Sequence, residues 1–124
     1  MTIFNLGSIN IDHIYRMEHL PRPGETLMAA EVSSVLGGKG ANQSIAAARA
    51  GADVRHIGAV GALDGWTIEI LVAAGVDTAH TLSLPGPSGH AVLYVDAAAE
   101  NSIVLFGGAN QQIAQDQIDS ALAK

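Results

Sequence analysis

Residues 37–42, Gly-Gly-Lys-Gly-Ala-Asn, lie between a β-like segment and an Ala-rich segment, and they restrict the fold more than any other stretch. Glycine permits a positive φ and a close approach of the backbone to a bound molecule. A helix that follows presents unsatisfied N–H groups and the positive end of its dipole. Lys39 adds a mobile cation, and Asn42 adds an amide that donates and accepts hydrogen bonds. The stretch therefore predicts a strand-to-helix loop that holds a polar ligand.

The spacing of this loop differs from that of the known nucleotide-phosphate loops. A P-loop needs Ser or Thr directly after its lysine, but Gly40 follows Lys39. The dinucleotide-binding fingerprint needs glycine or alanine at the position that Gln43 occupies. Nucleotide-phosphate binding here is therefore weakly supported, and a tight turn with an exposed lysine is the alternative.

Charge and composition argue against several classes of function. The chain of 124 residues has 12 Asp and Glu against 6 Lys and Arg, so we expect no nucleic-acid partner. The absence of cysteine excludes disulfides, thiolate zinc sites and cysteine nucleophiles. No segment approaches the roughly 18 apolar residues that span a bilayer, so we expect no membrane partner and a cytoplasmic location. The histidines lack a compact metal-ligand spacing, and we expect no metal site.

The pattern of apolar residues predicts alternating strands and helices. We expect strands over residues 3–9 and 54–60, short exposed strands within 25–35, an edge strand within 76–84, and a hairpin of 91–96 and 102–106. Helices are expected over 43–50 and 66–74, ended by Gly51 and Gly75. A terminal amphipathic helix is also expected, and its buried stripe should consist of Ile113, Ala114, Ile118, Ala121 and Leu122. This order is typical of an α/β sandwich with a partly parallel sheet.

Asn10 and Asp12 form a second candidate for ligand binding. They lie in a polar turn expected at 10–12, two residues apart, and would point to the same side if the backbone stays extended. A carboxylate accepts two hydrogen bonds and an amide both donates and accepts, which suits the vicinal hydroxyls of a sugar. An Asx turn that only caps the strand is the alternative. Asp64 is predicted to cap the helix that begins near Trp66.

Several motifs together resemble the amino-terminal half of the ribokinase-like (PfkB) carbohydrate kinases. Those that carry the resemblance, in order and spacing, are residues 7–12, 22–26 and 37–43. The similarity continues through 46–51, 57–61, 73–78 and 107–110, so it covers essentially the whole chain. One departure is the turn at 62–65, which is about two residues shorter than the usual family loop.

The resemblance implies a three-layer α/β/α sandwich core, incomplete here, with a small β-sheet lid. Residues 1–124 would be the amino-terminal part of a single domain. The lid would come from approximately residues 13–36 and part of 91–106. Such lids often pair in this family, so a homodimer through the lid is an expectation.

The resemblance also implies an ATP-dependent kinase that phosphorylates a sugar hydroxyl, with ribose favoured. ATP and Mg²⁺ are the expected cofactors, and a monovalent cation is a further family expectation. By their match to the family motifs, the expected substrate-binding residues are Asn10, Ile11, Asp12, Gly38, Lys39, Gly40, Ala41 and Asn42.

The family's catalytic aspartate belongs to a glycine-rich turn that does not occur before Lys124. We therefore expect the catalytic base and most of the nucleotide site beyond Lys124, and we name no catalytic residue. The alternatives are a non-catalytic sugar- or nucleoside-binding module, or another kinase of the family that acts on a fructose phosphate, a ketodeoxy sugar or a nucleoside.

These expectations predict that residues 1–124 alone form no ADP from ATP when ribose is added, because the residue that would deprotonate the sugar hydroxyl is expected elsewhere. An ADP-coupled assay with purified chain measures this. Sugar-dependent turnover by these residues would contradict the prediction.

Overall fold

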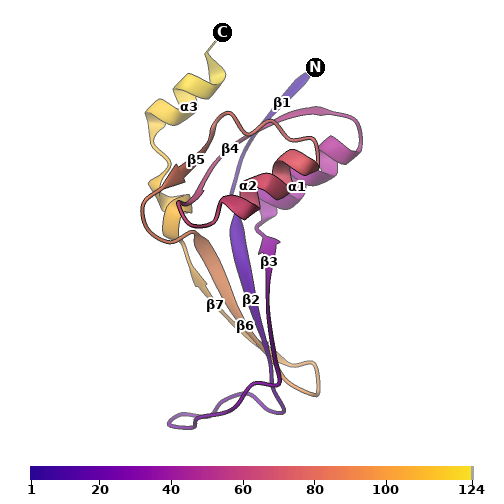
Figure 1. Cartoon of the computed structure of the whole chain (residues 1–124), viewed down its shortest axis with the longest axis vertical. Helices are drawn as coiled ribbons and strands as arrows, with labels where there is room; N and C mark the ends of the chain where they lie inside the picture. The colour runs from indigo at the N-terminus through magenta and orange to yellow at the C-terminus, as the bar shows by residue number, and fades with distance from the viewer. Residues whose placement is uncertain (124) are drawn as a thin grey trace.

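The computed structural model describes residues 1–123, which form two β-sheets and three α-helices (Figure 1). The strands are β1 (Thr2–Leu6), β2 (Asn10–Arg16), β3 (Glu31–Gly37), β4 (Asp53–Gly61), β5 (Thr81–Leu84), β6 (Gly89–Val95) and β7 (Asn101–Phe106). The helices are α1 (Lys39–Arg49), α2 (Gly65–Ala73), the short 3₁₀ helix η1 (Gly108–Gln112) and α3 (Gln115–Leu122).

The two sheets differ in topology. The three-stranded sheet has the order β1-β4-β5 and is parallel throughout. The four-stranded sheet has the order β3-β2-β6-β7, with β2 parallel to β6 and both outer pairs antiparallel. In Figure 1 this second sheet extends away from the three-stranded sheet and its helices. It contains residues 13–16 and 31–36 of the expected lid, together with most of 91–106.

The hydrophobic core lies between the three-stranded sheet and the helices α1 and α2. Val54 and Val60 of β4 pack in one buried cluster with Ala41 of α1 and Leu71 of α2. Ile57 and Ala59 of the same strand are also buried, and strand alternation directs them to the opposite face. In Figure 1, α3 lies on the side of β4 and β5 away from α1. Helices therefore cover both faces of this sheet.

Several sequence predictions are confirmed. Gly51 and Gly75 follow α1 and α2 with φ of 96° and 95°, so both helices end at the expected glycines. The edge strand and the hairpin also form, as β5 and as β6 with β7.

The boundaries predicted around residues 10–12 and 37–42 are wrong. The first strand ends at Leu6, and Asn10 begins β2 instead of a polar turn, because β2 pairs along its whole length with β3 and β6. The loop is also shorter than expected. Gly38 alone, with φ of 95°, reverses the chain, and α1 begins at Lys39. One residue in the left-handed region is enough to end a strand and start a helix.

The predicted inner stripe of the terminal helix is wrong in part. In α3 the buried residues are Gln117 and Ala121, whereas Ala114 and Leu122 are exposed. The amide of Gln117 donates to the backbone oxygens of Gly58 at 2.8 Å and of His80 at 3.0 Å. These hydrogen bonds turn the face that carries Gln117 toward the sheet.

Asp64 occupies the N-cap position of α2, but its side chain does not cap the helix. Its Oδ2 instead accepts a hydrogen bond of 2.6 Å from the Ser88 hydroxyl, and that hydroxyl oxygen accepts one of 2.7 Å from the Gly61 amide. The carboxylate therefore links the end of β4 to the segment before β6, and the prediction of a side-chain cap is wrong.

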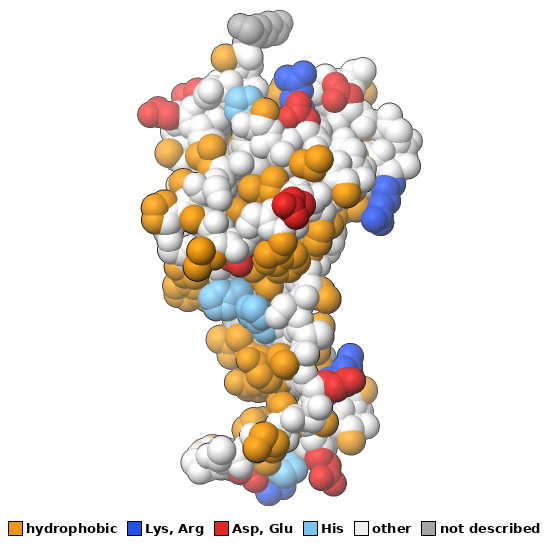
Figure 2. Space-filling view, viewed as in Figure 1, with side chains coloured by type: hydrophobic (Ala, Val, Ile, Leu, Met, Phe, Trp, Pro, Cys, Tyr) orange, Lys and Arg blue, Asp and Glu red, His pale blue; other side chains and the backbone are white. Residues whose placement is uncertain are grey.

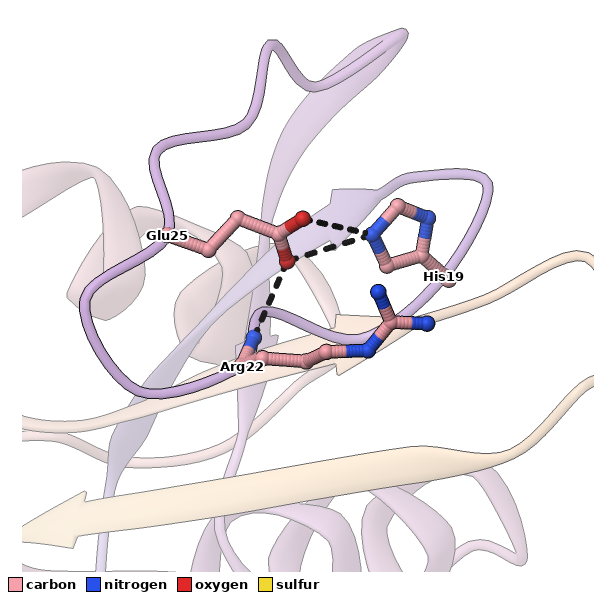
Figure 3. A network of polar contacts seen from close by, with 3 residues as sticks. All are labelled: His19, Arg22 and Glu25. Carbon is pink, nitrogen blue, oxygen red and sulfur yellow. Dashed lines mark hydrogen bonds and ion pairs between the residues drawn. The ribbon is translucent and has the colours of Figure 1, made fainter.

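The connection between β2 and β3 carries a compact polar turn at the far end of the four-stranded sheet (Figures 1 and 3). The Glu25 carboxylate accepts a hydrogen bond of 3.0 Å from the backbone amide of Arg22 and lies 3.1 Å from Nε2 of His19. The Arg22 amide, followed by His19, holds the pKa of Glu25 below its usual value. This turn is well separated along the sheet from Asn10 and Asp12.

No helix within residues 1–123 has the length and apolar character needed to cross a membrane.

We expect Gly40→Ala to lower the free energy of unfolding by about 2 kcal/mol, because a Cβ at Gly40 would lie 2.6 Å from Cα of Gly7 and overpack the contact between α1 and the end of β1. Urea denaturation followed by circular dichroism measures the change. Gly65→Ala in the first turn of α2 is the matched control. It meets no atom within 4 Å, so it should leave the stability unchanged or raise it by up to about 1 kcal/mol. Equal effects of the two substitutions would contradict the close-approach argument.

Candidate functional site

The amino end of α1 lies directly against the segment that joins β1 to β2. A Cβ at Gly38 would lie 2.7 Å from the backbone oxygen of Ser8 and 2.8 Å from the backbone nitrogen of Asn10. The amide of Ala41 donates to the same Ser8 oxygen at 3.0 Å. Glycines therefore allow backbone to approach backbone, and they bring the first turn of α1 beside the start of β2.

A partly buried chain of hydrogen bonds connects the residues around this contact. The Asn5 amide nitrogen donates to the backbone oxygen of Gly40 at 3.0 Å and to the Ser44 hydroxyl at 2.9 Å. The Ser44 oxygen lies 2.7 Å from Nδ1 of His56, and Nε2 of His56 lies 3.1 Å from the backbone oxygen of Gly7. A carbonyl can only accept, so Nε2 carries the proton, and in the neutral ring Nδ1 accepts from the Ser44 hydroxyl. A neutral His56 therefore satisfies both of its ring nitrogens in this chain of hydrogen bonds.

The environment of His56 favours that neutral form. Its side chain is fully buried. Burial lowers the pKa of His56 below the usual value because it disfavours the charged ring, and the hydrogen bond to the Gly7 oxygen opposes this only in part. An uncharged imidazole therefore joins Ser44 of α1 to the end of β1.

Asn10 and Asp12 lie on one face of β2, and glycines flank Asn10 in both neighbouring strands. Gly37 of β3 and Gly89 of β6 are its register partners. A Cβ at Gly37 would lie 2.7 Å from the carboxyl carbon of Asp12, so the carboxylate occupies the space above that glycine. Within residues 1–123 no group donates a hydrogen bond to the Asp12 carboxylate. It is half-buried and available to a donor from a ligand.

The other predicted site residues divide into two groups. Lys39 and Asn42 are exposed on the first turn of α1, close in the chain to the Gly38 turn. Ile11 and Ala41 are buried, and Gly40 is held against Gly7. Ile11 and Ala41 therefore pack beneath the surface, whereas Lys39 and Asn42 present exposed polar side chains.

Asn110 contacts the predicted site residue Asn10, although the sequence did not predict Asn110 as part of the site. Its amide lies beside Asn10, with Nδ2 of Asn110 donating to Oδ1 of Asn10 at 2.7 Å. The only signal in the sequence was its place in the motif at 107–110. Asn110 and Asn10 are 100 residues apart, so no local pattern could predict their contact.

The site is an open face and not an enclosed cavity. The adjoining cavity has a volume of about 340 Å³ and is lined by Leu6, Gly7, Ser8, Asn110, Ile113 and Ile118, without Asn10 or Asp12. Residues 1–123 contain no group of three or more His, Asp or Glu side chains that could hold a metal ion. The first turn of α1 lacks the spacing of a phosphate loop.

Comparison with known proteins identifies the family. The family model described as pfkB family carbohydrate kinase matches residues 2–124. The chain belongs to the pfkB family. It is 41% identical over 117 residues to a ribokinase of Haemophilus influenzae, a match that covers 92% of this chain and 38% of the relative. It is 36% identical over 124 residues to a deoxyribokinase of Salmonella typhi, covering 98% of this chain and 40% of the relative. This pfkB-family chain therefore spans about two fifths of the length of these relatives.

Solved structures of the family have the same fold. The ribokinase of Cryptococcus neoformans var. grubii serotype A, in complex with ADP, matches with a TM-score of 0.83 and 42% identity, covering 87% of this chain and 35% of that one. The ribokinase of Arabidopsis thaliana, complexed with ribose and ATP, matches with a TM-score of 0.78 and 28% identity, covering 95% of this chain and 41% of that one. These matches confirm the predicted ribokinase-like α/β fold, of which the chain contains part.

We expect the stability of this pfkB-family chain to fall as the pH is lowered from 7 to 5, in part through His56. The folded-state pKa of His56 lies below that of the unfolded chain, about 6.5. Its contribution is therefore fully present above that value and is lost as the unfolded chain takes up the proton. The slope from this group is at most about 1.4 kcal/mol per pH unit.

Urea denaturation at several pH values measures this effect. The difference in unfolding free energy between the unsubstituted chain and His56→Gln should shrink toward pH 5. His80→Gln is the control, because within residues 1–123 only the backbone oxygen of His80 takes part in a hydrogen bond, so this substitution leaves the chain of hydrogen bonds around His56 intact. A difference for His56→Gln that is constant from pH 7 to 5 would contradict the assignment of a neutral His56.

Proposed function

We propose that this chain provides the sugar-binding face of an ATP-dependent carbohydrate kinase, which transfers the γ-phosphoryl group of ATP to a hydroxyl of a pentose, with ribose favoured. The observation that carries the proposal is the Asp12 carboxylate, which lies beside Asn10 without a donor from residues 1–123. Membership of the pfkB family and similarity to proteins named ribokinase and deoxyribokinase support the choice of a pentose.

The proposed contacts follow from the chemistry of a sugar diol. Asp12 accepts hydrogen bonds from hydroxyl groups, Asn10 adds an amide, and Lys39 and Asn42 donate from the first turn of α1. The rest of the proposed sugar-binding face is backbone, at Ile11, Gly38, Gly40 and Ala41. Phosphoryl transfer depends mainly on positioning and charge stabilisation, so a rigid arrangement of these groups would aim the reacting hydroxyl. ATP supplies the phosphoryl group, with Mg²⁺ and a monovalent cation as family expectations.

The four-stranded sheet is proposed as the lid, formed by residues 13–36 and part of 91–106. Covering the sugar excludes water and so protects ATP from hydrolysis. Figure 2 shows apolar side chains along this part of the molecule. Those of β7 are between 52% and 69% exposed and comprise Ile103, Val104, Leu105 and Phe106. An exposed apolar strand of this kind supports the proposal of a homodimer through the lid.

We expect D-ribose to shift backbone amide signals of the ¹⁵N-labelled chain at residues 10–12 and 38–42. Asp12→Asn should weaken binding about tenfold or more, because it removes a charged acceptor while preserving the shape of the side chain. Asp116→Asn, in the exposed first turn of α3, removes the same charge away from the site and should leave the affinity unchanged.

Titrations with fructose 6-phosphate and adenosine in place of ribose test the choice of sugar. If either compound binds at the same residues more tightly than D-ribose, that compound would take the place of ribose as the proposed substrate. Shifts that lie elsewhere, or an unchanged affinity in Asp12→Asn, would overturn the proposed sugar-binding face.

A further inference from the structure

The amide orientation of Asn110 is determined by the backbone of Ile9. Oδ1 of Asn110 lies 3.0 Å from the Ile9 nitrogen, and Nδ2 lies 3.2 Å from the Ile9 oxygen. A backbone N–H can only donate and a backbone carbonyl can only accept. The reversed amide would face both groups with the wrong partner, so one orientation of Asn110 is selected.

This orientation in turn selects the orientation of Asn10. Nδ2 of Asn110 lies 2.7 Å from a side-chain atom of Asn10, and since the Asn110 nitrogen donates, that atom must be the oxygen Oδ1. The amide nitrogen of Asn10 is then directed away from Asn110. It is left to donate on the face of β2 that also carries the Asp12 carboxylate.

Gly89 provides the space that this pair of amides needs. A Cβ at Gly89 would collide with Nδ2 of Asn110 and would lie 2.7 Å from both Oδ1 of Asn10 and the backbone oxygen of Gly107. Gly89 is the register partner of Asn10 in β6, and η1 brings Asn110 over it. The absence of a side chain at this position therefore allows a residue 100 positions away to reach Asn10.

We propose that Asn110 is a positioning residue that sets the hydrogen-bond polarity of the sugar site. Through Asn110, Asn10 acts toward the ligand as a donor, while Asp12 acts as an acceptor. The site then suits a diol in which one hydroxyl oxygen accepts from Asn10 and a neighbouring hydroxyl donates to Asp12. The ligand assignment rests on the proposed function, whereas the amide orientation does not.

Side-chain amide exchange tests the orientation without any ligand. The NH₂ signals of Asn10 and Asn110 can be assigned by triple-resonance NMR of the labelled chain. We expect the Asn110 protons, bonded to Asn10 and Ile9, to exchange about tenfold more slowly than those of Asn10. Slower exchange at Asn10 than at Asn110 in the unsubstituted chain would overturn the inference, and this result requires no variant to fold.

A double-mutant cycle tests whether Asn110 acts through Asn10. Asn110→Asp keeps the acceptor for the Ile9 amide but removes the donor to Asn10, and D-ribose affinity should fall about tenfold. In the Asn10→Ala background the same substitution should cost little, because the side chain that it orients is gone. Asn101→Asp, at the exposed start of β7, is the matched control and should not change the affinity.

The outcomes separate this inference from the proposed function. Additive losses in the double variant would show a merely structural role for Asn110 and would overturn the positioning role. If ribose does not bind the unsubstituted chain, the proposed function fails, and the exchange rates of the two amides still decide the orientation.

Discussion

The close approach of Gly40 in α1 to Gly7 after β1 is the constraint on which the site depends. A Cβ at Gly40 would lie 2.6 Å from Cα of Gly7, so the helix and the chain crossing from β1 to β2 meet backbone to backbone. This contact brings the first turn of α1, which carries Lys39 and Asn42, beside the start of β2, which carries Asn10 and Asp12. A side chain at either glycine would force the helix away from this segment.

Polar groups inside the molecule make this contact specific. Asn5 donates to Ser44, Ser44 donates to the neutral His56, and His56 donates to the backbone oxygen of Gly7. The carbonyl oxygens of Gly7 and Gly40 impose this order, because they can only accept. The backbone of Ile9 imposes the orientation of Asn110 in the same way. Backbone groups cannot exchange donor for acceptor, so they fix the polarity of the neutral side chains around them. Such fixed polarity would allow the proposed sugar site to distinguish hydroxyl donors from acceptors.

Family membership and the geometry around Asn10 and Asp12 together support the proposed function. The pfkB family model matches residues 2–124, and the fold matches solved ribokinases. What the geometry adds is a division among the predicted site residues. Asn10, Asp12, Lys39 and Asn42 offer polar side chains, whereas Ile11 and Ala41 are buried and Gly38 and Gly40 allow the backbone to pass. The four-stranded sheet emerges directly from this site, which is why we propose it as the cover of the sugar.

The sequence by itself determined the family, the α/β class, the glycine ends of α1 and α2 and the β6–β7 hairpin, because these depend on local backbone preferences and on motifs read in order. Only the tertiary structure decided that Asn10 begins a strand, that Asp64 bonds to Ser88 and that Asn110 orients Asn10. Each of these outcomes joins residues far apart in the chain. Local propensity cannot predict them, since the partner's position is set by how the two sheets and α1 pack together.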